Sequence, residues 1–274
     1  MLDMSRRVIL QLAVVFLVFS GPVQAGDVED LTQTLRIDEV IEVLRDECLL
    51  FGADLERDML DNNGGPVWRS QLAAIYDTDR MTTAIRAALE AGLSEQQIAR
   101  SRTFFATELG QRILSLETSA RQAMADPEVE QIARDMYLEL AQADDDRLAT
   151  ITRFIEVNDL VEYNVVGALN ASYYFMRGLV DGGTSEMSEA EIIAEVWSQE
   201  QETRTDTQEW LYGFLLLAYR PLSDSELASY ISYSETQAGQ ALNTALFAGF
   251  DRMYLDISHA LGVLVAQSSV TKDL

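Results

Sequence analysis

The residue types that carry most enzyme chemistry are scarce in this chain. His259 is the only histidine and Cys48 the only cysteine, which argues against histidine-rich metal sites, His-Glu-x-x-His proteases and Ser-His or Cys-His nucleophile pairs. Lysine is nearly absent, with Lys272 in the tail, so Schiff-base chemistry has no candidate residue. We expect His259 on a helix surface. Cys48 precedes an apolar run and is predicted to be a buried thiol, with a reactive or intermolecular thiol as the less favoured alternative.

Carboxylates are plentiful, and paired acids can hydrolyse glycosides or bind calcium. The run Asp144–Asp146 lacks the ligand spacing and the glycine of a calcium loop. Glu39 with Glu42, and Glu189 with Glu191, fit acids on helix surfaces and in first turns, where the helix dipole favours them. We therefore predict no catalytic residue, no metal ligand and no cofactor.

Aromatic residues are the best candidates for binding a small molecule. They could line an apolar groove for a peptide or a lipid tail, although packing in the core is their more common use. The candidate groove aromatics are Trp68, Tyr173, Tyr174, Trp197 and Trp210.

The elements that would position these residues include a repeated stretch. The segment from Leu93 to Glu117 recurs without gaps from Leu222 to Leu246, at a constant offset of 129. The same offset pairs Trp68 with Trp197. Because identity at a fixed offset is the signature of an internal repeat, we predict a doubled unit rather than a solenoid.

Each copy reads as a helix, a tight corner and a second helix. Ser94 with Gln97 forms a predicted capping box, so a helix starts at about residue 95, and Ser223 with Glu226 repeats the box in the second copy. Ser188 with Glu191 is a third predicted box, outside the repeated stretch. Thr107 is a plausible cap for the next helix, and Gly110 in its first turn permits the close approach of another backbone. The repeated Thr-x-x-Gly-Gln corners are candidates for a structural or binding role. They comprise Thr107, Gly110, Gln111, Thr236, Gly239 and Gln240.

At these corners the chain resembles Domain of Unknown Function 2059, a family of secreted bacterial helical proteins. The family motif is an aromatic residue followed by Ser-Pro-x-Gly-x-Lys/Arg, after a Leu-Ser/Thr-x-x-Glu/Gln-Leu/Ile helix start. The first copy has this pattern at 104–112, and the second has it more weakly at 233–240. Both copies have Thr in place of Ser, and Glu108 or Gln237 stands where Pro is usual. The resemblance implies an all-helical envelope protein and no particular activity.

Periodicity and turn residues predict an all-α fold, a helical bundle built from two related units at residues 26–154 and 155–274. Whether the units share one core is left open. The predicted helices include 37–60, 67–91, 127–143 and a closing helix at 245–266. A further predicted helix carries Trp197 and ends before Pro221, and its polar middle could interrupt it. The segment 27–34 is predicted to be frayed, and the tail 267–274 to be loose.

Residues 1–25 have the three parts of a secretory signal. Arg6-Arg7 precede the apolar run from Val8 to Phe19, and the small-residue exit ends at Ala25. We expect cleavage before Gly26, a periplasmic location and no membrane span in the mature chain, because the apolar run is too short to span comfortably. The formal net charge of −25 argues against nucleic acid as a partner.

Three functional hypotheses follow. The first is a non-catalytic periplasmic factor that interacts with another envelope protein or acts like a chaperone. The second is a carrier that holds a small apolar ligand in an aromatic-lined groove. The third, and least favoured, is an envelope glycan hydrolase that uses a pair of acids.

Overall fold

The computed structural model describes residues 25–143 and 145–270, and within these ranges all regular elements are α-helices. The predicted all-α class is confirmed. The predicted signal segment lies outside the described residues, apart from Ala25. The helices are α1 Ala25–Thr34, α2 Ile37–Leu60, α3 Gly65–Ile75, α4 Thr78–Gly92, α5 Glu95–Phe105, α6 Glu108–Met124, α7 Pro127–Leu140, α8 Asp146–Val157, α9 Leu160–Asp181, α10 Glu189–Ser198, α11 Glu200–Tyr219, α12 Asp224–Ser234 and α13 Gln237–Val270.

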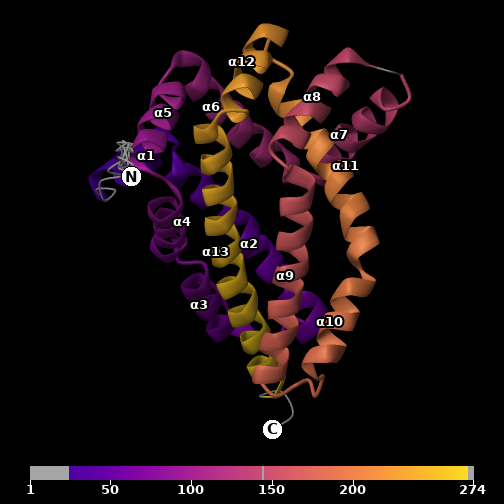
Figure 1. Cartoon of the computed structure of the whole chain (residues 1–274). Helices are drawn as coiled ribbons and strands as arrows, with labels where there is room; N and C mark the ends of the chain where they lie inside the picture. The colour runs from indigo at the N-terminus through magenta and orange to yellow at the C-terminus, as the bar shows by residue number, and fades with distance from the viewer. Residues whose placement is uncertain (1–24, 144, 271–274) are drawn as a thin grey trace, which may run out of the picture.

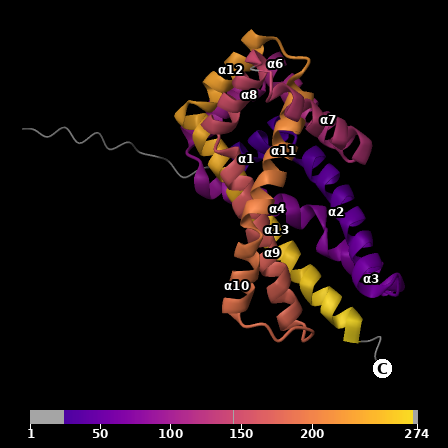
Figure 2. The same ribbon diagram turned by 90° about the vertical axis from the view of Figure 1, so that its right-hand side faces the viewer.

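The long helices α9 and α13 run side by side through the middle and lower part of the view in Figure 1. Helix α13 also packs against α4, whereas α11 packs against α6, α7 and α9. Figure 2 shows α2 and α3 on the side of α13 away from α10. The axis of the fold is therefore a pair of helices from the second half of the chain.

The described residues form two hydrophobic cores, and each core combines both halves of the chain. The first is built from α1 to α5 together with α13, including Ile41, Ile85 and Leu261. The second joins α6 to α8, α11 and α12, including Ile113, Ile151 and Leu227. The boundary predicted at residues 154 and 155 thus does not separate one core from the other.

The predicted capping boxes of α5 and α12 are confirmed. Ser94 and Gln97 satisfy each other's backbone N–H groups at the start of α5, as do Ser223 and Glu226 at the start of α12. A third predicted box, at Ser188, begins α10. These reciprocal bonds satisfy N–H groups that a helix start otherwise leaves without partners.

The two Thr-x-x-Gly-Gln corners have matching hydrogen bonds. The Gln111 amide donates to the carbonyl oxygens of Thr34 and Phe105, each at 2.8 Å. The Gln240 amide donates to those of Val157 and Ser234, also at 2.8 Å. Each glutamine therefore ties its corner to the end of another helix, α1 in the first case and α8 in the second.

Aromatic rings join the two corners. The rings of Phe104 and Tyr233, which the offset of 129 pairs, stack with their centroids 4.3 Å apart. The Tyr233 hydroxyl also donates to the Ser101 hydroxyl at 2.8 Å. The contact brings α5 and α12 together where the two cores meet.

Several predicted boundaries were wrong. The segment 27–34 is the ordered helix α1, because Val28 and Leu31 are buried in the first core. The helix predicted at 67–91 is broken after Ile75, because the Asp77 side chain caps a new helix by accepting from the backbone N–H of Arg80. The closing helix predicted at 245–266 is the later part of the continuous helix α13, which also takes in the start of the tail predicted to be loose.

The corner glycines lie against the end of the preceding helix. A Cβ atom on Gly110 would lie 2.5 Å from the Phe104 carbonyl oxygen and from the Phe105 Cα atom. On Gly239 it would lie 2.8 Å from the Ser234 Cα atom. Because backbone atoms cannot move aside as a flexible side chain can, a larger residue at either position would open the corner.

We predict that Gly110→Leu and Gly239→Leu each lower the free energy of unfolding by about 2 to 4 kcal/mol, as overpacking against backbone does. Chemical denaturation monitored by circular dichroism measures this. Gly26→Ala is the control, because a Cβ there meets nothing within 4 Å. Unchanged stability in both leucine variants would contradict the role given to these glycines.

Candidate binding site: a cavity between the two cores

A cavity of about 360 Å³ lies between the two cores. Its volume falls in the usual range for sites that hold small molecules, from ~300 to ~1,000 Å³. Most lining side chains are apolar or aromatic, among them Leu44, Phe154, Phe214, Phe247 and Phe250. They come from α2, α8, α11 and α13, so both halves of the chain form its wall.

Glu117 on α6 is the one carboxylic acid that lines this cavity among the described residues. The buried side of α6 carries Ile113, Ala120 and Met124. Glu117 follows Ile113 by four residues and precedes Ala120 by three, so the helical period places it on that side. The helix therefore directs an acid inward from its apolar face.

Two tyrosines hold the Glu117 carboxyl. The hydroxyls of Tyr219 and Tyr230 both donate to its Oε1 atom, at 2.6 and 3.4 Å. Burial raises the pKa of Glu117 to about 7, and these two hydrogen bonds oppose the rise. The carboxyl is therefore close to half ionised near neutral pH.

Three asparagines add polar atoms to the wall. Asn158, Asn164 and Asn243 each donate an amide N–H to a backbone carbonyl, of Phe154, Leu160 and Asn158 respectively. Because a carbonyl can only accept, each amide nitrogen must face it, and the Oδ1 atoms stay available as acceptors. Asn164 is exposed, so the cavity opens to solvent beside it.

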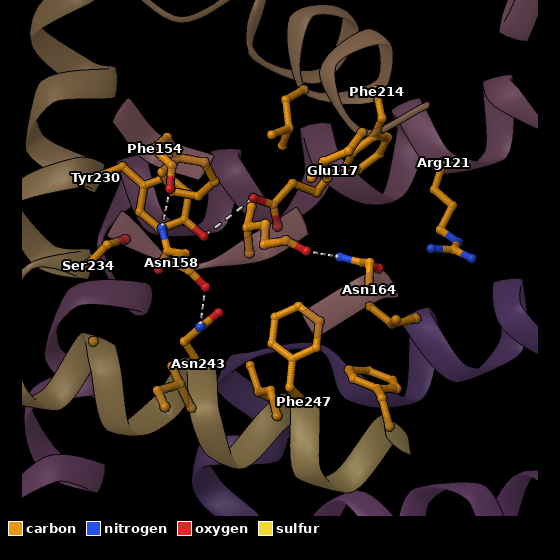
Figure 3. A pocket seen from close by; sticks show the side chains of 18 of the residues that line it. Glu117, Arg121, Phe154, Asn158, Asn164, Phe214, Tyr230, Ser234, Asn243 and Phe247 are labelled. Carbon is orange, nitrogen blue, oxygen red and sulfur yellow. Dashed lines mark hydrogen bonds between the residues drawn. The ribbon is translucent and has the colours of Figure 1, made fainter. Parts of the chain in front are cut away.

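Arg121 lies at the edge of the cavity, where an ion pair balances its charge. Its guanidinium binds both carboxylate oxygens of Glu47, at 2.7 to 3.1 Å. It also lies over the Trp210 ring, 5.6 Å from the ring centre. Figure 3 shows Arg121 away from the centre, whereas the Glu117 carboxyl lies near Tyr230 and above Phe247.

A second apolar cavity, of about 450 Å³, lies between α2, α9 and α13. Tyr254 lines both cavities, and Glu47 lines this one. Cys48 is also part of its wall, and burial raises the pKa of the thiol to about 11. A thiol with so high a pKa is mostly protonated at neutral pH and is a poor nucleophile.

The predicted groove aromatics fall in three places. Trp210 lines the cavity that contains Glu117. Tyr173, Tyr174 and Trp197 lie together in a separate groove of about 400 Å³ between α9 and α10. Trp68 is 1% exposed and belongs to the first core, so it packs there instead of lining a groove.

Of the predicted corner residues, the structure brings one to the cavity. Gly239 forms part of its wall. Thr107 and Thr236 accept hydrogen bonds from the backbone N–H groups of Gly110 and Gly239, each at 3.0 Å. The threonines therefore cap α6 and α13.

Sequence reasoning missed the central acid. Glu117 is the last residue of the repeated stretch and was not singled out. Ile113 and Ala120 lie on one helical face, and their spacing could have indicated that Glu117 between them points into the interior. His259 was placed as expected, on the surface of α13, where its Nε2 atom lies 2.9 Å from Asp181.

The fold and the cavity define an all-helical protein with an acid inside a largely aromatic cavity. Residues 79–137, from α4 into α7, match the model of the family described as "Uncharacterized protein conserved in bacteria (DUF2059)". The resemblance to this family is confirmed over that segment, which contains the first corner and Glu117. The matched segment does not extend to the second copy of the repeat. No curated protein and no solved structure matches the chain.

We predict that ionisation of Glu117 lowers the stability of the folded protein as pH rises. Its pKa rises from 4.5 to about 7 on folding, so its contribution to stability is complete below about pH 4.5 and is lost as pH rises through about 7. Glu117→Gln should leave the melting temperature nearly unchanged at about pH 4 and raise stability by about 1 to 3 kcal/mol at about pH 8.

Thermal denaturation across this pH range measures the difference between variant and parent. Glu108→Gln, at an exposed position of the same helix, is the control and should show no such dependence. A difference between Glu117→Gln and parent that stays constant with pH would contradict the prediction.

Proposed function

We propose that this protein binds a small, largely apolar ligand in the cavity between its two cores and acts as a carrier or sensor of it. One observation carries the proposal: aromatic and aliphatic side chains surround about 360 Å³ of space, with a few polar atoms at defined places. Specific sites for small molecules combine an apolar wall with a few oriented polar groups in this way.

Binding is better supported than hydrolysis. An enzyme that cleaves glycosides needs two carboxyl groups about 5 to 10 Å apart across the bond. Among the described residues, Glu117 is the one carboxylic acid in the wall, and its Oε1 atom is engaged by two tyrosines. The geometry therefore suits holding a ligand.

A second candidate, an interaction with an envelope protein, is favoured by the surface of α9 and α10. Trp197 is 65% exposed, Val166 48%, Ile193 42% and Tyr174 37%. All four line the groove between these helices. Exposed apolar residues gathered in one place often mark binding surfaces.

We also propose that the chain is exported to the periplasm and that its two helical units arose by duplication. The predicted signal segment supports export, and the matching hydrogen bonds of Gln111 and Gln240 support duplication. Within residues 25–143 and 145–270, no helix combines the length and apolar character that crossing a membrane requires.

Export makes a simple prediction. Protein isolated from the periplasmic fraction of a bacterium that expresses the full chain should have the mass of residues 26–274, because cleavage after a small-residue exit removes the signal. Intact-mass spectrometry measures this. Full-length protein recovered from the cytoplasmic fraction alone would contradict export.

Ligand binding makes a second prediction. We expect 1-decanol to bind with one-to-one stoichiometry, measured by native mass spectrometry and by isothermal titration calorimetry. Leu246→Trp places a larger side chain in the cavity wall and should weaken binding at least about tenfold, because filling the space removes room for the chain. Ala248→Trp, at an exposed position of α13, should have no effect.

Two results would redirect the assignment. Equal binding by parent and Leu246→Trp would place the ligand outside this cavity. Native mass spectrometry of protein taken directly from cells distinguishes the candidates: an excess of a few hundred daltons supports the carrier, and a protein-sized excess supports the interaction factor.

A further inference from the structure

We infer that the ligand of the cavity carries a positively charged amine, which binds against Glu117 while an apolar tail occupies the aromatic part of the cavity. This inference rests on the proposed function and deepens it. It names the chemical class of the ligand as an amphiphilic ammonium compound.

The hydrogen bonds of Glu117 leave one carboxyl oxygen available. Both tyrosine hydroxyls donate to Oε1. No described residue donates to Oε2, and that atom is not closed off from the surrounding space. An ionised carboxylate accepts hydrogen bonds but does not donate them. A ligand that donates a hydrogen bond would therefore complement Oε2.

Three asparagines in the wall add hydrogen-bond acceptors. Asn158, Asn164 and Asn243 each donate one amide N–H to a backbone carbonyl, and none of the described residues donates to their Oδ1 atoms. An ammonium group has three N–H donors and no acceptor, so it complements such a wall. An ionised carboxylate ligand has no N–H or O–H to donate to these oxygens, and its charge would be repelled by the Glu117 carboxylate.

Aromatic faces add to the preference for a cation. Phe154 and Tyr230 pack with their ring centres 4.9 Å apart, and Phe214 and Phe247 also line the cavity. A cation within about 6 Å of a ring face is attracted to it, by about 0.5 to 2 kcal/mol when water is excluded. Together with the Glu117 carboxylate, these rings offset the cost of removing a charge from water.

Arg121, the one cationic side chain that the described residues place in the wall, does not favour an anion. Arg121 donates three hydrogen bonds to Glu47 and lies over Trp210. Its charge is therefore already compensated. The formal net charge of −25 also draws cations toward the protein and repels anions at low ionic strength.

Three probes with the same tail and different head groups test the inference: decylammonium, 1-decanol and decanoate. Isothermal titration calorimetry at about pH 8, where Glu117 is mostly ionised, compares their affinities. Decylammonium should bind at least about tenfold more tightly than 1-decanol, and decanoate should be the weakest. Glu117→Gln should abolish the preference, so that decylammonium no longer binds more tightly than 1-decanol.

Glu108→Gln is the matched control, because it removes one negative charge from an exposed position of the same helix; it should keep the preference. Thermal denaturation verifies that each variant is folded. Equal affinity for decylammonium and 1-decanol in the parent, or tightest binding of decanoate, would overturn the ammonium inference while leaving a ligand cavity. If none of the three probes binds, the proposed function itself fails.

Discussion

The burial of helix α13 along its length is the constraint on which the rest of this structure depends. Leu242 and Leu261 of this helix belong to the first core, which is otherwise built from α1 to α5. The helix also runs beside α9. A helix with apolar residues on several sides cannot remain at a surface, because burying each large side chain contributes about 1.5 to 3 kcal/mol. Both halves of the chain must therefore pack around it.

Small residues set how closely α13 can approach its neighbours. A Cβ on Gly262 would lie 2.9 Å from the Cα atom of Gly178 on α9. On Gly249 it would lie 3.0 Å from the Cα atom of Ile85 on α4. Leu246 and Phe250, on either side of Gly249 in the sequence, carry larger side chains and line the cavity. Close contact at the glycines and open space between the cores are two results of the same packing.

The cavity combines a feature that stabilises the folded protein with one that destabilises it. Its aromatic wall extends the apolar interior, whereas Glu117 introduces an acid whose ionisation burial opposes. Tyr219 and Tyr230 reduce that cost through one carboxyl oxygen and leave the other available. Costs of this kind often mark functional sites, and a ligand of opposite charge would offset this one.

Local features of this protein could be predicted from its sequence. The capping boxes at Ser94, Ser188 and Ser223, the all-α class and the family resemblance follow from short-range patterns, because a cap depends on residues three positions apart. The break at Asp77 was missed, since the apolar pattern continues across it. The order of α1 was also missed, because its burial depends on helices distant in sequence.

The site was decided by tertiary structure alone. The sequence indicated the aromatic residues as a group, yet Trp68 lies in a core, Trp210 in the central cavity, and Tyr173 with Trp197 in a separate groove. The pairing of Glu117 with two tyrosines spans more than one hundred residues. Periodicity determines which face of a helix is buried, but the partner that buries it depends on how all the helices pack. The sequence by itself therefore determined the helices and their caps, and the packing around α13 determined the cavity.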